Sequence, residues 1–391
     1  MRTTQIPPNN GLPGVYRSLP TGVKHARIRL VGIPGGIAVT LCSLAPGIGC
    51  AATKTTPNPH FRLAVRYDVE SMRIGLDRTA RNKRIRTDLT RASELGFDAV
   101  AFECVEDDER AEMVETASSS GLEAIVPDRG AQYYLLTGRL PSSFASIDDM
   151  IRGKLRGWSA RNGFAGLSIG RVASSPGAND RCIKVLAAAR ELGVPCVMLA
   201  TTIDLPRDGS AFAVVDAGEL ADDAVGSPLE RLLARFHGEL AAGRTAGLVV
   251  DRFSSAPGDR AGLVNVDDPP TAAKLAAVQG LVRRAKRWGP RLFGCRSEVV
   301  RGASADGEGA SLTTFVLGLR RYVLLFNPSR EHYVRGSVAA PASIDGRPVA
   351  RLVEVPPTPE RVAGEVFESQ RGSVTIRVDL RPGDAALFEV F

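Results

Sequence analysis

Acidic residues end several of the apolar runs in this sequence, and they are the first candidates for chemistry. They stand at six places, namely Asp68, Glu103, Asp128, Asp204, Asp251 and Glu298. Two carboxyl groups held at one site can divide the roles of proton donor and of base or nucleophile. Catalysis by paired carboxylates is therefore the chemistry to expect, provided that the fold brings two of these acids together.

Other kinds of site are poorly supported by the sequence. The chain has 4 histidines and 6 cysteines, and no cysteine pair has the spacing of a metal site. His237 follows Leu233 by one turn of a predicted helix, so we expect a partly buried structural residue. We therefore expect neither a histidine-based metal site nor a serine–histidine–aspartate triad. No glycine-rich dinucleotide motif follows the first predicted strand, and we expect no cofactor.

The elements that must position the acids follow a repeated pattern. A predicted helix ends at Gly96, Gly121 or Gly193, and an apolar strand begins at once. Glycine adopts the left-handed conformation that ends a helix without a steric penalty. Apolar strands that alternate with helices indicate a parallel sheet covered on both faces. The predicted strands span residues 61–68, 97–104, 122–127, 164–170, 195–201, 246–251 and 291–296, with a possible eighth at 211–215.

Eight such strands in this length of chain are typical of an α/β fold of the (β/α)8 TIM type. An open doubly wound sheet is the competing fold. Near residue 301 the pattern changes to short strands with turns, such as Asp345-Gly346 and Pro382-Gly383. We therefore expect the barrel over residues 61–300, a linker over 301–312 and a small all-β sandwich over 313–391.

The first 49 residues have the composition of an export segment. They hold no acid and five basic side chains, and residues 30–49 are uncharged. A basic stretch followed by an apolar one is typical of a signal for export. Small residues before Cys50 resemble a bacterial lipoprotein cleavage site, at which the cysteine is lipidated, although the usual leucine three residues earlier is absent. We therefore expect residues 1–49 to be an export or lipoprotein signal, and residues 50–60 to be a linker.

The expected location is periplasmic, cell-surface or secreted, and the alternative is an apolar arm packed on the fold. The same segment explains the charge. The formal net charge is +7, but without the five basic residues of the export segment it falls to about +2, and the rest of the chain shows no basic patch. We therefore expect no nucleic-acid partner. Contact with a membrane is expected only through a lipid anchor at Cys50.

Several stretches resemble the barrel and sandwich domains of glycoside hydrolases. The sequences RASELGFDAVAFECV and AEMVETASSSGLEAIVPD are similar to the early helix–strand units of those barrels. The sequences YVLLFNPS and LRPGDAALFEVF resemble the sandwich that follows them. The resemblance covers most of residues 61–391 as a pattern and indicates no single family. It implies a carbohydrate substrate or ligand.

Under this resemblance, two carboxyl groups at the C-terminal ends of barrel strands would cleave a glycosidic bond. Glu103 and Asp251 are the leading catalytic pair, because each ends an apolar run close to a loop. The other residues expected to bind substrate are Asp68, Asp128, Arg171, Arg252 and Tyr67. The arginines could bind hydroxyls or a carboxylate with two parallel hydrogen bonds.

Two departures from the pattern keep a second hypothesis open. The fourth predicted strand ends in Gly170-Arg171, where the largest group of such barrels has a catalytic glutamate. The chain also has only 2 tryptophans to stack on sugar rings. The alternative is a non-catalytic carbohydrate-binding or scaffolding lipoprotein. Carboxylates facing each other across the barrel mouth at about 5–10 Å would favour the enzyme, and carboxylates each tied to an arginine would favour the scaffold.

Overall fold

The computed structural model describes most of the chain from His60 onward, and residues 54–391 belong to one compact unit. The export segment and Cys50 lie outside the described residues. No helix in the described part is both long and apolar enough to cross a membrane. The described ranges are 60–70, 76–103, 105, 109–158, 163–171, 177–194, 196–199, 207–220, 226–254, 263, 270–300, 309–357, 364–369 and 374–391.

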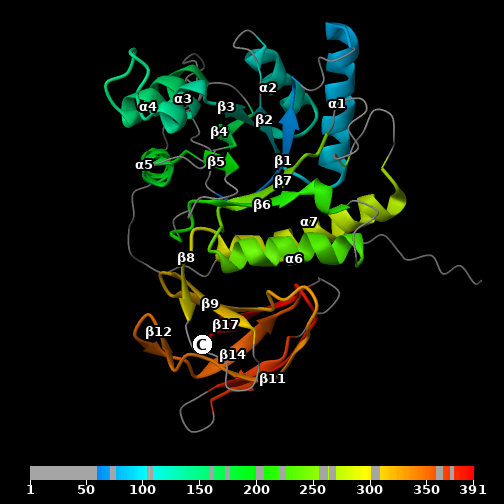
Figure 1. Ribbon diagram of the computed structural model, residues 1–391, viewed down its shortest axis with the longest axis vertical. Helices are drawn as coiled ribbons and strands as arrows, with labels where there is room; N and C mark the ends of the chain where they lie inside the picture. The colour runs from blue at the N-terminus through cyan, green and yellow to red at the C-terminus, as the bar shows by residue number, and fades with distance from the viewer. Residues whose placement is uncertain are drawn as a thin grey trace, which may run out of the picture. The chain divides into compact units, whose positions relative to one another are not determined.

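A parallel sheet of the TIM type forms the first part of this unit (Figure 1). Its hydrogen-bonded order is β5-β4-β3-β2-β1-β7-β6, and the two outermost strands, β5 and β6, also approach each other. This is the cyclic order of a barrel. Its strands are β1 (Arg62–Asp68), β2 (Ala99–Glu103), β3 (Glu123–Pro127), β4 (Phe164–Arg171), β5 (Cys196–Leu199), β6 (Phe212–Asp216) and β7 (Gly247–Asp251).

The fold class is confirmed, but one predicted strand is wrong. The described residues supply seven parallel strands, including the 211–215 segment. The expected strand at 291–296 does not join them. Helix α7 (Ala272–Leu292) continues through Pro290 to Leu292, and β8 (Arg296–Val300) pairs antiparallel with β9 (Ser311–Leu317). Glu298 therefore belongs to the second sheet and does not lie at a barrel strand end.

Helices follow the strands, and several of them begin or end where local chemistry predicts. They are α1 (Arg78–Glu94), α2 (Arg110–Ser119), α3 (Arg129–Thr137), α4 (Ile147–Trp158), α5 (Ala178–Glu191), α6 (Pro228–Ala241) and α7. The capping box of α6 is present, with Ser227 and Glu230 satisfying each other's backbone N–H groups. After α1 and α2, Gly96 and Gly121 have φ values of 93° and 78°, the left-handed conformation expected of them.

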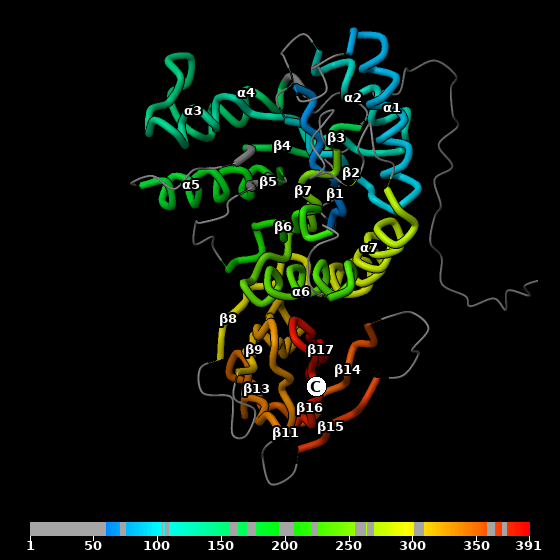
Figure 2. Tube along the Cα trace, turned by 45° about the vertical axis from the view of Figure 1, so that its right-hand side comes forward, coloured from blue at the N-terminus to red at the C-terminus, as the bar shows by residue number. Residues whose placement is uncertain are grey.

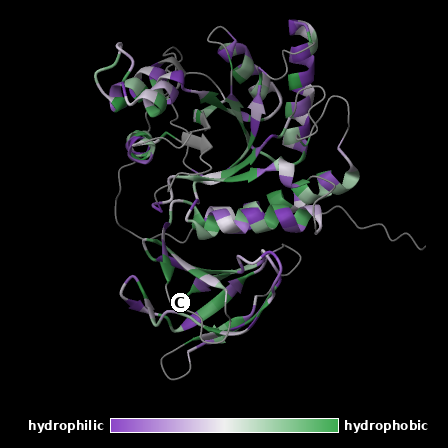
Figure 3. Ribbon diagram, in the orientation of Figure 1, coloured by the Kyte–Doolittle hydropathy of each residue, from purple (hydrophilic) through white to green (hydrophobic). Residues whose placement is uncertain are grey.

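Side chains alternate between the inside and outside of the barrel, because successive residues of a strand point to opposite faces. The outer positions pack under the helices in the main core, and β6 and β7 are apolar along most of their length (Figure 3). The inner layer is small and separate. It consists of Ala64, Ala99, Ala101, Ile125, Ala165, Phe212 and Val249. Gly247 makes room for the Phe212 ring, which a Cβ would meet at 2.3 Å.

The second part of the unit is an antiparallel β-sandwich. One sheet has the order β15-β14-β17-β10-β9-β8, and β11 pairs with β16 in the facing layer. Apolar residues such as Val323, Leu325, Val338 and Ile376 fill the space between the layers. The additional strands are β10 (Arg320–Phe326), β11 (Val334–Ala339), β12 (Ser343–Ile344), β13 (Arg347–Pro348), β14 (Arg351–Val355), β15 (Val366–Glu368), β16 (Thr375–Leu380) and β17 (Ala385–Val390).

The barrel helices α6 and α7 are in contact with this sandwich (Figure 2). His237 on α6 is fully buried, which confirms a structural role. Its Nε2 accepts from Nη1 of Arg284 at 2.9 Å, so its Nδ1 carries the proton and donates to the Gly383 carbonyl at 3.0 Å. The ring stacks on Trp288 with 5.3 Å between centroids. Burial, and then the charge of Arg284, lower the pKa of His237 to about 3.

This histidine predicts a pH-dependent stability. The unfolded His237 takes up a proton near its ordinary pKa of about 6.5, whereas the folded one stays neutral down to about 3. The unfolded state therefore binds more protons in this window, and stability falls as the pH falls from 6.5. We expect His237→Gln to lower the melting temperature at pH 7.5, with a difference from the wild type that narrows at pH 5. A difference that is constant with pH would contradict the prediction.

Candidate active site at the barrel mouth

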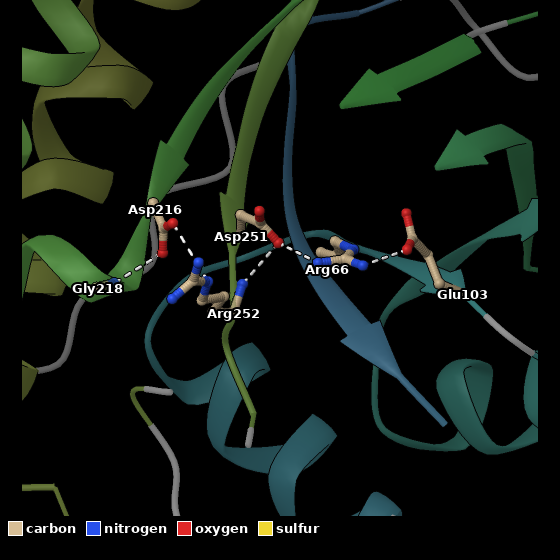
Figure 4. Close-up of polar contacts among 6 residues, drawn as sticks. All are labelled: Arg66, Glu103, Asp216, Gly218, Asp251 and Arg252. Carbon is tan, nitrogen blue, oxygen red and sulfur yellow. Dashed lines mark hydrogen bonds and ion pairs between the residues drawn. The ribbon is translucent and has the colours of Figure 1, made fainter. Parts of the chain in front are cut away.

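Three adjacent strands bring two predicted acids onto one arginine at the C-terminal end of the barrel (Figure 4). Arg66 of β1 donates through Nη1 to Oδ1 of Asp251 on β7 at 2.6 Å, and through Nη2 to Oε2 of Glu103 on β2. The exposed fractions of the three side chains are 13%, 7% and 6%, respectively. Glu103 and Asp251 therefore lie at one buried site, as their strand-end positions predicted.

Arg66 is the main site residue that the sequence analysis missed. It lies two residues before Asp68 in a strand otherwise dominated by buried apolar side chains. An arginine in such a strand needs a charged partner, and this was the feature of the sequence that could have indicated a site residue. Residues 66 and 68 share the inner face because strand side chains alternate. The same alternation corrects the prediction for Tyr67. Its side chain faces α1, is fully buried, and donates its hydroxyl to Asp88 at 2.9 Å.

Burial dominates the electrostatics of this group. It raises the pKa of Glu103 above its usual value, and the negative charges of Asp251 and Asp68 act in the same direction. The bonds from Arg66 act against the shift without cancelling it. For Arg66, burial favours loss of the proton, but the two carboxylates outweigh burial and raise its pKa. Arg66 therefore stays charged, and Glu103 loses its proton at a higher pH than an exposed glutamate does.

A second ion pair lies beside the first (Figure 4). Nε of Arg252 is 3.3 Å from Oδ2 of Asp216, the last residue of β6, and Oδ1 of Asp216 accepts from the Gly218 N–H at 2.8 Å. Both charged side chains are partly exposed, at 42% and 37%. The backbone N–H of Arg252 donates to Oδ1 of Asp251 at 2.8 Å. Asp251 therefore accepts two N–H donors on one oxygen.

Arg252 holds its position in an unusual backbone conformation. Its φ of 53° lies in the left-handed region that non-glycine residues rarely adopt. Within the described ranges Asp345 is the other non-glycine residue of this kind, and it lies in a sandwich turn. Strain of this sort persists where the surroundings hold it in place, and it is frequent at functional sites. Substrate binding by Arg252 stays a prediction.

The remaining predicted residues have different surroundings. Asp68 is level with Glu103 in the sheet, and its Oδ1 accepts from the Glu70 N–H at 3.0 Å. Asp128 is fully buried, and its Oδ1 caps α3 by accepting from Gly130 and Ala131. Oδ1 is therefore a helix cap, whereas Oδ2 is buried and has no hydrogen-bond partner among the described residues. Arg171 is the last residue of β4, and its side chain is not among those that the structure describes. Asp204 and Cys50 also lie outside the described residues.

Glu103 keeps one oxygen away from the arginine. Its Oε1 is buried and has no hydrogen-bond partner in the part of the chain that is described. Glu103 Oε2 and Asp251 Oδ1 are less than about 8 Å apart, because each is hydrogen-bonded to one terminal nitrogen of the same guanidinium. That bound includes the roughly 5 Å of retaining glycoside hydrolases and the lower part of the roughly 6.5–9.5 Å range of inverting ones. The described residues contain no group of three acids, histidines or cysteines arranged to hold a metal.

Comparisons with known proteins find similar solved structures at low sequence identity and no match among protein sequences. No protein-family profile and no curated protein sequence matches it. Among solved structures it is similar to an Anoxybacillus α-amylase, with 10% identity, a TM-score of 0.47 and coverage of 84% of this chain and 97% of that one. The maltogenic α-amylase AmyB of Thermotoga neapolitana has 9% identity and a TM-score of 0.47, with coverage of 84% and 98%.

A third similar structure is the GH36 α-galactosidase AgaA of Geobacillus stearothermophilus, in complex with 1-deoxygalactonojirimycin. Its identity is 11% and its TM-score 0.46, with coverage of 85% of this chain but only 56% of the α-galactosidase. These three structures are described as two α-amylases and an α-galactosidase, and no single family is established for this chain. Because the identities are near 10%, these structures do not indicate the substrate or the reaction of this protein.

Proposed function

We propose that this protein binds a carbohydrate at the barrel mouth and hydrolyses a glycosidic bond through Glu103 and Asp251. The observation that carries the proposal is that two buried carboxyl groups lie within about 8 Å of each other at the C-terminal ends of β2 and β7. Barrel enzymes place their catalytic groups at this end of the strands. Hydrolysis of a glycosidic bond requires two such groups with different roles.

The surroundings of the two acids suggest which role each would take. Burial raises the pKa of Glu103, and a raised pKa is the direction that the role of general acid requires of a carboxyl group. Its Oε1 would protonate the glycosidic oxygen as the bond to the anomeric carbon breaks. Asp251 accepts N–H donors from Arg66 and from Arg252. As an anion, it would face the positive charge that develops on the sugar, and water would complete the hydrolysis.

A second candidate is a barrel that binds carbohydrate without cleaving it. The observation that favours it is the shared ion pair itself, because Arg66 occupies one oxygen of both carboxylates. The end of β4 at Arg171 also carries no acid. A guanidinium between two carboxylates can have a purely structural role, in which it neutralises and orients them. The residues that would bind sugar hydroxyls are the same in both candidates, so turnover is the property that separates them.

The test is a screen of the purified protein against a broad panel of glycosides and polysaccharides. Release of reducing sugar from at least one substrate supports the enzyme. Binding in glycan arrays or by calorimetry, with no release of product, supports the second candidate. If the protein neither cleaves nor binds any carbohydrate of the panel, both are rejected.

We also propose that the protein is exported and anchored through a lipid on Cys50. The basis is the basic and then uncharged composition of residues 1–49, followed by small residues and a cysteine. In a bacterial host grown with labelled palmitate, we expect label on the wild type and its recovery with membranes. We expect Cys50→Ser to lose the label and to appear in the soluble fraction. Labelling that survives the substitution would rule out an anchor at this cysteine.

A further inference from the structure

The hydroxyl of Ser168 is buried inside the barrel and has no use in the fold among the residues that the structure describes. Ser168 on β4 is 0% exposed, and its Oγ makes no hydrogen bond within the described part of the chain. The backbone of Ser168 is already fixed, because its carbonyl accepts from the Asp128 N–H at 2.8 Å. Burying a hydroxyl without a partner costs about 1–3 kcal/mol. An alanine would satisfy the fold equally well, so the hydroxyl needs another explanation.

The alternation of β4 directs Ser168 to the inside of the barrel. Its neighbours Leu167 and Ile169 belong to the outer core beneath the helices. Ala165, near the start of the strand, belongs to the inner layer. The pairing of β3 and β4 shifts register at Ala165, because Ala124 pairs with Phe164 and Ile125 pairs with Gly166. After the shift Ser168 pairs with Pro127, which stands two residues after the inward-facing Ile125.

The strand pairing also sets the height of Ser168 in the barrel. Ala101 of β2 pairs with Ile125 of β3, and two further residues bring Glu103 level with Pro127, the partner of Ser168. The backbones of β2 and β4 are therefore about 10 Å apart at this level, because neighbouring strands are about 4.8 Å apart. The β3 position between them is a proline, which has no polar side chain. Glu103 Oε1 and Ser168 Oγ thus both face inward on either side of Pro127.

These two atoms have complementary chemistry for one ligand group. Serine can donate and accept, and the carboxyl group can accept or, when protonated, donate. A sugar hydroxyl between them can donate to one and accept from the other. We propose that Ser168 is a ligand-binding residue of the barrel mouth, which binds one hydroxyl of the sugar together with Glu103. This inference rests on the proposed carbohydrate site and adds a residue that determines its affinity and specificity.

The test measures binding of three iminosugars to the purified full-length protein by calorimetry. They are 1-deoxynojirimycin and its galacto and manno isomers, which combine ring hydroxyls with a positive nitrogen that suits paired carboxylates. For the probe that binds, we expect Ser168→Ala to raise Kd about tenfold or more, as for the loss of a hydrogen bond to a buried site. We expect its melting temperature to stay at or above that of the wild type, since no hydrogen bond of the fold is lost.

Thr245→Val is the matched control. Thr245 is also 0% exposed with an unpartnered hydroxyl, but it precedes β7 at the opposite end of the barrel. We expect its Kd to equal that of the wild type. If Ser168→Ala binds as tightly as the wild type, the inference is wrong while the carbohydrate site stands. An equal loss in both variants would assign the effect to packing and would also overturn the inference. If the wild type binds none of the three probes and no carbohydrate of the panel, the carbohydrate site and the inference both fail.

Discussion

Glu103→Gln should lower turnover of an unactivated glycoside by about 10²- to 10⁴-fold, the usual contribution of a general acid. Glutamine keeps the size of the side chain and an oxygen that can accept from Arg66, but it has no proton to give to the leaving oxygen. An aryl glycoside with a dinitrophenolate leaving group needs no such proton. We therefore expect its rate of bond cleavage to fall far less. The measurement is kcat for both substrates in the variant and in the wild type.

Glu123→Gln is the matched control for this prediction. Glu123 also lies on a barrel strand and pairs with the buried Arg62, at 3.0 Å, but it stands at the N-terminal end of β3. We expect its kcat to remain within twofold of the wild type on both substrates. If Glu103→Gln slows the two substrates equally, Glu103 is not the proton donor. Full turnover in Glu103→Gln would remove it from the mechanism.

The raised pKa of Glu103 also predicts the sign of a pH effect on stability. The folded protein holds the proton of Glu103 more tightly than the unfolded chain does. This group therefore contributes stability that is fully present below the unfolded pKa of about 4.3, and the contribution is lost as the pH rises through the folded value. We expect Glu103→Gln to remove this component, so that its melting temperature declines less between pH 4 and pH 7.

Arg66→Met should destabilise the fold by about 3–5 kcal/mol at neutral pH, because it leaves two buried carboxylates without their counter-charge. Arg66 touches both Glu103 and Asp251, and all three side chains are largely buried. The loss should shrink in acid, where protonation removes the repulsion. Adding Glu103→Gln to Arg66→Met should restore part of the stability, because it removes one of the two charges. Urea unfolding at pH 7 and pH 4.5 measures both effects.

Arg335→Met is a suitable comparison for Arg66→Met. Arg335 pairs with Asp379 at 3.1 Å, but both side chains are about two-thirds exposed. Ion pairs of this kind contribute little to stability, so we expect almost no change in unfolding. If Arg66→Met were as stable as Arg335→Met at pH 7, the three-residue group would not be the buried, charge-balanced site that its geometry indicates. Loss of stability that is the same at both pH values would also contradict its electrostatic origin.

Much of this protein is determined by short-range features of its sequence. The glycines after helices, the apolar strands and the cap of α6 depend on residues a few positions apart, and the structure confirms them. The strand-end positions of Asp68, Glu103 and Asp251 follow from the same local pattern. A barrel with a following sandwich was therefore predictable, as was the end of the barrel at which the acids gather.

The tertiary structure alone decided which charges meet. Arg66 and Asp251 are 185 residues apart in the sequence, and Arg66 and Glu103 are 37 apart. Local pattern contains no information about such pairing, which depends on β7 closing against β1. The inward or outward direction of Arg66, Tyr67 and Ser168 depends on strand register, and one residue of shift reverses it. The two acids could be predicted from the sequence as site residues. Arg66, which binds both of them, could be recognised only from the structure, because the contact requires β1, β2 and β7 to be adjacent.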